Sequence, residues 1–191
     1  APDATIRVSG QRTLPLTRRV QKVIDHPSFQ RLRKVRQLGP THWVYPGATH
    51  TRFEHSLGVY GTTREFLLSL LKTPSFAQSV SESQLLGALA AGLLHDIGHY
   101  PFAHSLEALH HKGRDTPRHE QLGADILLGK FEELHPGVKP LAEILRWEWR
   151  TSPELVCRLM TLKREQLTDP VEQILQSIIS GTIDADKMDY M

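Results

Sequence analysis

Apolar residues recur every three or four positions along most of this chain, which is the spacing of one face of an α-helix. Among residues 16–25, for example, Leu16, Val20, Val23 and Ile24 are interspersed with basic side chains. No segment alternates apolar and polar residues convincingly enough to predict a strand ladder. The pattern therefore predicts an all-α fold. The expected helices span residues 16–25, 27–38, 55–71, 81–94, 103–111, 119–133, 140–149, 153–163 and 170–180.

Caps and helix breakers mark several of the expected boundaries. Pro27 suits the first turn of a helix, and Gly39 stops the helix that follows. Ser81 and Gln84 have the spacing of a capping box at the start of the most apolar helix. Residues 40–51 contain a Pro-Gly pair and no sustained period, so they are expected to form a loop.

The composition is that of a packed globular domain. The chain has 191 residues, of which 39% are hydrophobic and 23% charged, which excludes collagen-like, low-complexity and disordered proteins. The longest apolar run, Leu85–Leu94, is half the roughly 20 residues that a membrane-spanning helix needs. No apolar segment follows the first arginines as in a signal peptide. With Cys157 as its one cysteine, the protein is expected to be cytoplasmic and not associated with a membrane.

Charge is distributed unevenly along the chain. Residues 1–95 hold 12 Lys/Arg and 5 Asp/Glu, whereas residues 96–191 hold 11 and 16. Two interpretations stay open: the first half presents an anion-binding face, or the two halves pair with each other on folding.

Histidines and carboxylates supply the candidate chemistry. The pair His95-Asp96 follows the most apolar helix, where a carboxylate is costly unless it is paired or bound to a cation. His55 begins an earlier helix, and Asp184, Asp186 and Asp189 cluster near the end. Imidazoles with carboxylates form a mixed nitrogen and oxygen ligand set, suited to catalytic Mn²⁺, Fe²⁺, Co²⁺, Zn²⁺ or Mg²⁺ rather than to a structural zinc.

Further polar residues follow this pair. His99, His104 and His119 are candidate proton donors, and Glu107 lies one helical turn after His104, where it can orient that ring. Three basic residues are candidates for binding phosphate: Arg52, Arg118 and Lys187. The remaining histidines are interpreted as surface or capping residues: His26, His42, His50, His110, His111 and His135.

These motifs resemble a known family. His55, the pair His95-Asp96 and the late aspartate in 183–190 are similar to the H…HD…D signature of HD-domain phosphohydrolases. Longer segments resemble the deoxynucleoside triphosphate (dNTP) triphosphohydrolase branch, which includes dGTPase-type enzymes and the SAM-and-HD-domain factor of animals. These segments are Phe29–Gly39, Tyr45–Gly58 and His99–His104, and the similarity covers about residues 14–190.

The resemblance implies a role for each matching position. The implied metal ligands are His55, His95, Asp96 and Asp186. The implied general acid and its helpers are His104, His119 and His99, and Glu107 stands where the family usually has an aspartate. The positions that match triphosphate-binding residues are Arg52, Lys187 and Tyr190, and those that match the lining of the deoxyribose pocket are Gln37 and Leu38.

The implied reaction is metal-dependent hydrolysis of a dNTP to deoxynucleoside and inorganic triphosphate. The implied assembly is a homo-oligomer, in which some relatives bind a nucleotide activator. Asp25, Gln30 and Arg33 match residues that recognise such an activator, although packing within this corner explains them equally well.

The ends of the chain differ from those of the family. The chain begins at Ala1 without the usual N-terminal segment and stops at Met191, directly after the last motif. We therefore expect residues 1–191 to form a single HD domain that is the N-terminal part of a longer chain.

Two alternatives remain from the sequence. The first is an HD phosphohydrolase acting on nucleoside monophosphates or signalling nucleotides. The second is a non-catalytic nucleotide or nucleic-acid binder, which would use the basic stripe in residues 18–36. Binding of single-stranded nucleic acid alongside catalysis also stays open.

Overall fold

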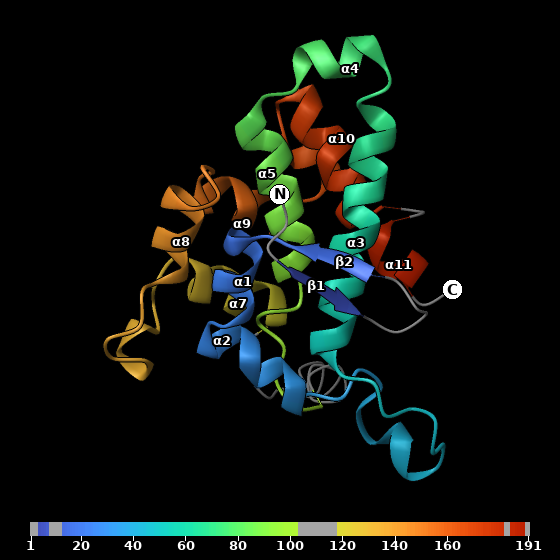
Figure 1. Ribbon diagram of the computed structural model, residues 1–191, viewed down its shortest axis with the longest axis vertical. Coiled ribbons are helices and arrows are strands. Elements are labelled where there is room, and N and C mark those ends of the chain that lie inside the picture. Colours follow the sequence, from blue (N-terminus) through green and yellow to red (C-terminus); the bar gives the residue numbers. More distant parts are fainter. Residues whose placement is uncertain (1–3, 8–12, 103–117, 182–183, 190–191) are drawn as a thin grey trace.

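The computed structural model describes residues 4–7, 13–102, 118–181 and 184–189. Its α-helices are α1 (Arg18–Ile24), α2 (Pro27–Gln30), α3 (Arg52–Leu70), α4 (Pro74–Ser79), α5 (Glu82–Leu94), α7 (His119–Leu127), α8 (Leu141–Trp147), α9 (Pro153–Thr161), α10 (Pro170–Ile179) and α11 (Ala185–Asp189). Short 3₁₀ helices are η2 (Arg31–Lys34), η3 (Gly39–Trp43), η5 (Glu132–Leu134) and η6 (Arg164–Gln166). The prediction of an all-α fold is confirmed (Figure 1).

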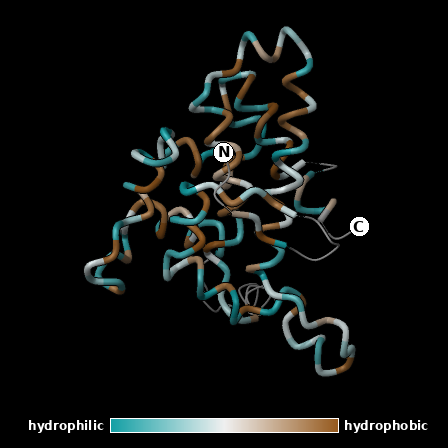
Figure 2. The backbone as a smooth tube through the Cα atoms, in the orientation of Figure 1, coloured by the Kyte–Doolittle hydropathy of each residue, from teal (hydrophilic) through white to brown (hydrophobic). Residues whose placement is uncertain are grey.

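Helices α3 and α5 form the centre of the molecule. They lie side by side, and α9 and α10 pack against α5 while α11 packs against α3 (Figure 1). The sequence-predicted capping box starts α5, because Ser81 and Gln84 each bind the other's backbone. α5 is hydrophobic along most of its length (Figure 2), and its last five residues, Ala90–Leu94, are all buried. No described helix is both long enough and apolar enough to span a membrane.

The absence of a strand ladder was predicted wrongly. Strands β1 (Ala4–Arg7) and β2 (Thr13–Leu16) pair antiparallel, with Ala4 opposite Leu16 and Arg7 opposite Thr13. Each strand has four residues, too few for an alternating pattern to stand out in the sequence. Leu16, expected to begin a helix, therefore ends a strand, and α1 begins at Arg18.

The single helix predicted over 27–38 is also wrong. The chain forms α2 and then η2, and it becomes extended at Val35. Here the backbone pairs with a distant segment: Gln37 N donates to the carbonyl of His50 at 3.1 Å, and Arg52 N donates to the carbonyl of Val35 at 2.9 Å. These bonds replace the helical ones. The helical apolar spacing still holds for burial, since Phe29, Leu32 and Val35 are all in the core.

Other helix boundaries shift by a few residues or more. α3 begins at Arg52 rather than His55, because Thr51 and Glu54 form a capping box that the sequence reading missed. The helix predicted over 119–133 ends at Leu127, shortly before Gly129 adopts a φ of 87°. The short helices α4 and α11 were not predicted. The helix predicted over 103–111 lies outside the described residues.

Candidate metal centre

The first turn of α3 brings Arg52 and His55 to the centre. Its N-cap Thr51 accepts a hydrogen bond from the backbone of Glu54, and the Glu54 side chain accepts one from the backbone of Thr51. This fixes where the helix begins and therefore which face carries the two side chains. Both are buried, with 4% of each residue exposed, so neither is a solvated surface group.

The end of α5 supplies His95, Asp96 and His99. His95 is the C-cap, and its Nδ1 lies 3.0 Å from the carbonyl of Gly92 one turn earlier. Because a carbonyl oxygen only accepts, Nδ1 is the donor in this contact, and Nε2 is the ring nitrogen left to face the candidate ligands. The following turn closes when the backbone of His99 donates to the carbonyl of Asp96 at 3.0 Å. The side chains of the His-Asp pair and of His99 therefore come from one tight turn.

Helix α11 separates the roles of two clustered aspartates. The carboxylate of Asp184 accepts hydrogen bonds from the backbone N–H groups of Gly181 and Lys187, so Asp184 is a cap at the start of the helix. Asp186 instead faces α3, with Oδ1 at 2.7 Å from Nε2 of His55. Of these two, Asp186 is the one that reaches the centre.

These three elements bring the predicted ligand side chains together. One ligand atom from each of His55, His95 and Asp96 lies within 4.8 Å of the others. Nε2 of His95 is 3.4 Å from Asp96 Oδ1 and 3.9 Å from Asp186 Oδ1. The rings of His55 and His95 meet edge to face at 5.2 Å. Residues 40 and more than 130 positions apart in the sequence therefore converge on one small volume.

Both carboxylates of the centre are held in the ionised form. Burial by itself would raise the pKa of Asp96, but His95, His99, Arg52 and His55 hold it well below its ordinary value. Burial would likewise raise the pKa of Asp186, which the hydrogen bond from His55 and the proximity of His95 keep low. The centre is thus strongly anionic at its carboxylates and lined by imidazoles.

The donor set fits a divalent cation. Nε2 of His95 is buried and has no hydrogen-bond partner among the described residues. A buried ring nitrogen without a hydrogen-bond partner, next to two ionised carboxylates, is a position that a bound cation would satisfy. Two imidazole nitrogens with carboxylate oxygens are ligands that Mn²⁺, Fe²⁺, Co²⁺ and Zn²⁺ accept.

A second pair of histidines adjoins the ligands. The rings of His99 and His119 are in contact, with centroids 3.7 Å apart and planes tilted by 47°. His99 Nδ1 is 3.3 Å from Asp96 Oδ1, and His119 Nε2 is 3.6 Å from Glu120. Two of the residues predicted to act in proton transfer are therefore beside the centre. The other two, His104 and Glu107, lie outside the described residues.

The residues predicted to bind substrate are placed unequally. Arg52 Nη1 donates to Asp96 Oδ2 at 2.7 Å. Lys187 has an exposed side chain whose Nζ donates to Asp184 Oδ2 at 2.8 Å. Gln37 is buried, its neighbour Leu38 is 43% exposed, and Tyr190 lies outside the described residues.

Ion pairs between the two halves of the chain support the interpretation that the basic half and the acidic half pair with each other on folding. Arg52 with Asp96 and Lys22 with Glu148 each join the basic half to the acidic half.

Packing within the domain accounts for two of the three residues that match activator recognition in the family. Gln30 donates to the carbonyl of Ile24 at 2.7 Å, and Arg33 donates to Gln30 and lies over the ring of Phe53.

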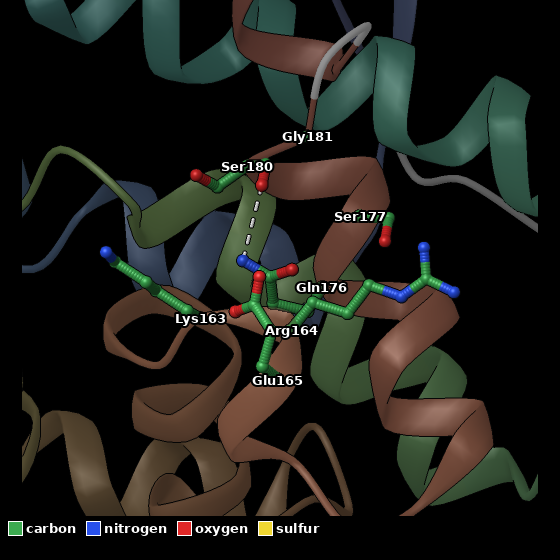
Figure 3. A pocket seen from close by; sticks show the side chains of 7 residues that line it. All are labelled: Lys163, Arg164, Glu165, Gln176, Ser177, Ser180 and Gly181. Atoms are coloured by element: carbon green, nitrogen blue, oxygen red, sulfur yellow. Dashed lines mark hydrogen bonds between the residues drawn. The ribbon is translucent and has the colours of Figure 1, made fainter.

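A separate cavity lies near the end of α10. It measures about 470 Å³, and its lining includes none of the predicted site residues that the structure describes. Figure 3 shows its lining, in which Glu165 projects toward the amide of Gln176 while Lys163 and Arg164 extend in opposite directions. The complete lining is Lys163, Arg164, Glu165, Gln176, Ser177, Ser180 and Gly181.

Comparison with known proteins identifies the family. A family model described as HD domain matches residues 52–186, from the first residue of α3 to Asp186. The chain belongs to the HD domain family. HD domains bind divalent metal ions, and the grouping of His55, His95 and Asp96 agrees with the divalent metal expected from the sequence.

Several curated proteins resemble this HD domain. The uncharacterized protein YwfO of Bacillus subtilis is 38% identical over 172 residues, which cover 88% of this chain and 34% of that protein. The uncharacterized protein MG461 homolog of Mycoplasma pneumoniae is 34% identical over 175 residues, which cover 92% of this chain and 38% of that protein. The deoxynucleoside triphosphate triphosphohydrolase SAMHD1 of Homo sapiens is 34% identical over 200 residues, which cover 88% of this chain and 29% of that protein. The chain thus spans about a third of the length of these relatives, and the family resemblance noted in its motifs is confirmed.

Proposed function

We propose that this HD domain belongs to a metal-dependent phosphohydrolase that cleaves dNTPs to deoxynucleoside and inorganic triphosphate. The observation that carries the proposal is the convergence of His55, His95, Asp96 and Asp186 beside the adjoining pair His99–His119. A site for binding alone has no need of metal ligands next to proton donors. The similarity to a human deoxynucleoside triphosphate triphosphohydrolase supports the choice of substrate.

The ligand residues hold the metal, and a buried arginine supports them. When bound, a divalent metal supplies Lewis-acid activation of a phosphoryl oxygen and of water. Arg52 donates to Asp96 through Nη1 and keeps that carboxylate ionised and oriented. Its guanidinium has further N–H donors with which it binds a phosphate of the substrate. Lys187, held near α11 by Asp184, adds positive charge for the triphosphate.

Proton transfer is assigned to the histidines that are not metal ligands. Water attacks the α-phosphorus, the bond to the 5′-oxygen breaks, and that oxygen takes a proton as it leaves. We assign the donor to His104, by its match to the family motif. His99 and His119 lie together next to Asp96, and we assign them the role of helpers of this general acid.

Recognition of the sugar is assigned to Gln37 and Leu38. The Gln37 amide can bond the 3′-hydroxyl, and the exposed Leu38 crowds the position of a 2′-hydroxyl. Steric exclusion predicts poor turnover of ribonucleotides. Gln37→Ala is expected to raise the KM for dNTPs more than it lowers kcat, as measured by steady-state kinetics.

Product analysis tests the proposal directly. The protein loaded with Mn²⁺ or Mg²⁺ is incubated with each dNTP, with GTP and with dNMPs, and the products are separated by chromatography. Deoxynucleoside and intact triphosphate are the expected products. Asp96→Asn is expected to abolish them, whereas Asp125→Asn, which changes an aspartate paired with Lys130, is the matched control and keeps them.

Three results would contradict the proposal. Orthophosphate released from dNMPs as the main product would indicate the monophosphatase alternative. Equal kcat/KM for GTP and dGTP would contradict the assigned reading of the sugar. Binding of nucleotides or single-stranded nucleic acid without any turnover would favour the non-catalytic alternative.

A further inference from the structure

Arg31 lies in η2, outside the ligand set, yet it contacts the turn that carries the His-Asp pair. Its two terminal nitrogens donate to two backbone carbonyls, Nη2 to Ile97 and Nη1 to His99. Both carbonyls lie just beyond the C-terminus of α5, in and directly after the turn formed by residues 95–98. The planar guanidinium therefore holds two points of this turn at once.

The opposite side of the same turn is closed by backbone. A Cβ atom on Gly98 would lie 1.9 Å from the carbonyl oxygen of His119 and 2.4 Å from the nitrogen of Gly123. α7 therefore packs directly on the turn at the one position without a side chain. Residues 97–99 are held between the Arg31 guanidinium and the first turns of α7.

The segment that contains Arg31 also holds the other ligand-bearing helix. Directly after η2, the backbone of Val35 and Gln37 pairs with His50 and Arg52, at the start of α3. Segment 31–37 therefore contacts both the turn that presents Asp96 and the helix end that presents His55. One short stretch of chain thus connects the turn that carries Asp96 to the start of the helix that carries His55.

We propose that Arg31 is a positioning residue for the metal centre, which sets the placement of the His95-Asp96 turn relative to His55 on α3. Arg31 acts on the centre through the backbone carbonyls of Ile97 and His99. The inference rests on the metal centre of the proposed function.

The chemistry of the contact explains why arginine is needed. Two carbonyls on one turn require two donors in a fixed fork, which guanidinium provides and an ammonium or a single amide does not. Burial lowers the pKa of Arg31 from its ordinary value, yet a guanidinium remains protonated at neutral pH. Loss of the fork would let the turn move while the hydrophobic core around Leu32 stays in place.

Metal binding measured without substrate tests this role. Arg31→Lys and Arg31→Gln are compared with the wild type and with Lys34→Gln, which changes an exposed cation on the same 3₁₀ helix. Mn²⁺ affinity is measured by calorimetry, and the visible spectrum of the Co²⁺-loaded protein reports the ligand geometry. Arg31→Gln is expected to weaken Mn²⁺ binding by about 10- to 100-fold and to change the Co²⁺ spectrum, with Arg31→Lys between it and the wild type.

The control separates positioning from stability. Urea unfolding of the metal-free proteins gives the stability of each variant, and affinities are compared only for folded protein. A merely structural Arg31 would lower stability and leave affinity and the Co²⁺ spectrum as in Lys34→Gln, which would overturn the proposal. If Arg31→Gln does not fold, wild-type affinity and spectrum in Arg31→Lys would overturn it equally.

Activity distinguishes this inference from the proposed function. With dNTPs, the Arg31 variants are expected to lose kcat at saturating Mn²⁺ more than they gain in KM, since the substrate contacts remain. If dNTPs are not hydrolysed by the wild type, the proposed function fails, but the metal affinities still decide the role of Arg31.

Discussion

Individual side chains in this HD domain take their roles from their neighbours. Asp96 is buried and would be protonated alone, but Arg52 and three histidines surround it and keep it charged. His95 is fixed by the carbonyl of Gly92, which directs Nε2 inward. Asp184 and Asp186 are two residues apart, yet one caps a helix and the other faces His55.

The first prediction concerns Asp96. Asp96→Ala is expected to abolish metal binding, because it removes a ligand and leaves the Arg52 cation unpaired next to the imidazoles. The metal content of the purified protein checks this, with circular dichroism to confirm that the helices persist. Full occupancy in the variant would show that Asp96 is not a ligand.

The second prediction separates the acid from the ligands. His104→Ala is expected to keep the metal and to lower kcat by roughly 10²- to 10⁴-fold, the range for loss of a general acid. Metal analysis and steady-state kinetics on the same sample provide the measurement. An unchanged kcat at saturating substrate would transfer the role to His119 or to water.

The ends of helices, rather than their middles, build this centre. The N-terminus of α3, the C-terminus of α5 and the short α11 each present a candidate ligand side chain at a capped end. Helix termini suit a metal centre because caps and turns fix the orientation of the few side chains next to them. Packing of α3 against α5 and α11 then brings the three ends together.

The cap of α3 offers a third prediction. Thr51→Ala removes the side-chain oxygen that accepts from Glu54, and a loss of about 0.5–2 kcal/mol in the free energy of unfolding is expected. Ser81→Ala, the equivalent change at the start of α5, is expected to cost a similar amount.

Metal affinity distinguishes these two caps. Only Thr51→Ala is expected to weaken metal binding as well, because His55 lies in the first turn of α3 whereas Ser81 is at the far end of α5 from His95. Urea unfolding and Mn²⁺ calorimetry give both quantities. Equal metal affinity in the two variants would show that the Thr51 cap does not position His55.

Away from the metal centre, packing of the molecule buries His26 and favours its neutral form. Burial, and to a smaller degree His135, lowers the pKa of His26 to about 4. Its Nδ1 accepts a hydrogen bond from the backbone of Ser28, so the ring also caps α2. Protonation of the ring would remove that acceptor, so the helix cap and the lowered pKa both favour neutral His26.

A pH dependence of stability follows as the fourth prediction. The folded pKa of about 4 lies below the ordinary value of 6.5, so the unfolded chain binds the proton first as the pH falls. Stability is therefore fully present above about pH 6.5 and decreases between pH 6.5 and 4, by at most about 3 kcal/mol. Urea unfolding across this range, compared with His26→Asn, which keeps an acceptor but does not titrate, provides the measurement. Parallel curves for the two proteins would contradict it.

The amino-acid sequence by itself determined the fold class and the ligand types. Helical spacing of apolar residues depends only on local geometry, which is why α5, α8, α9 and α10 fall within their predicted ranges. The chemistry of a metal restricts which residue types serve as ligands, so the sequence indicated His55, His95-Asp96 and the cluster of Asp184, Asp186 and Asp189 as candidates. The choice of Asp186 within that cluster came from the resemblance to HD-domain phosphohydrolases.

Tertiary structure alone decided how those residues are used. Long-range pairing of 35–37 with 50–52 overrode the helical period of 27–38, because backbone groups bond whichever partner folding brings near. The same folding placed Arg31 against the turn of Ile97 and His99, 66 and 68 residues away, where no local pattern signals a contact. Contacts between distant segments depend on packing of the whole core, which residue spacing along the chain does not encode.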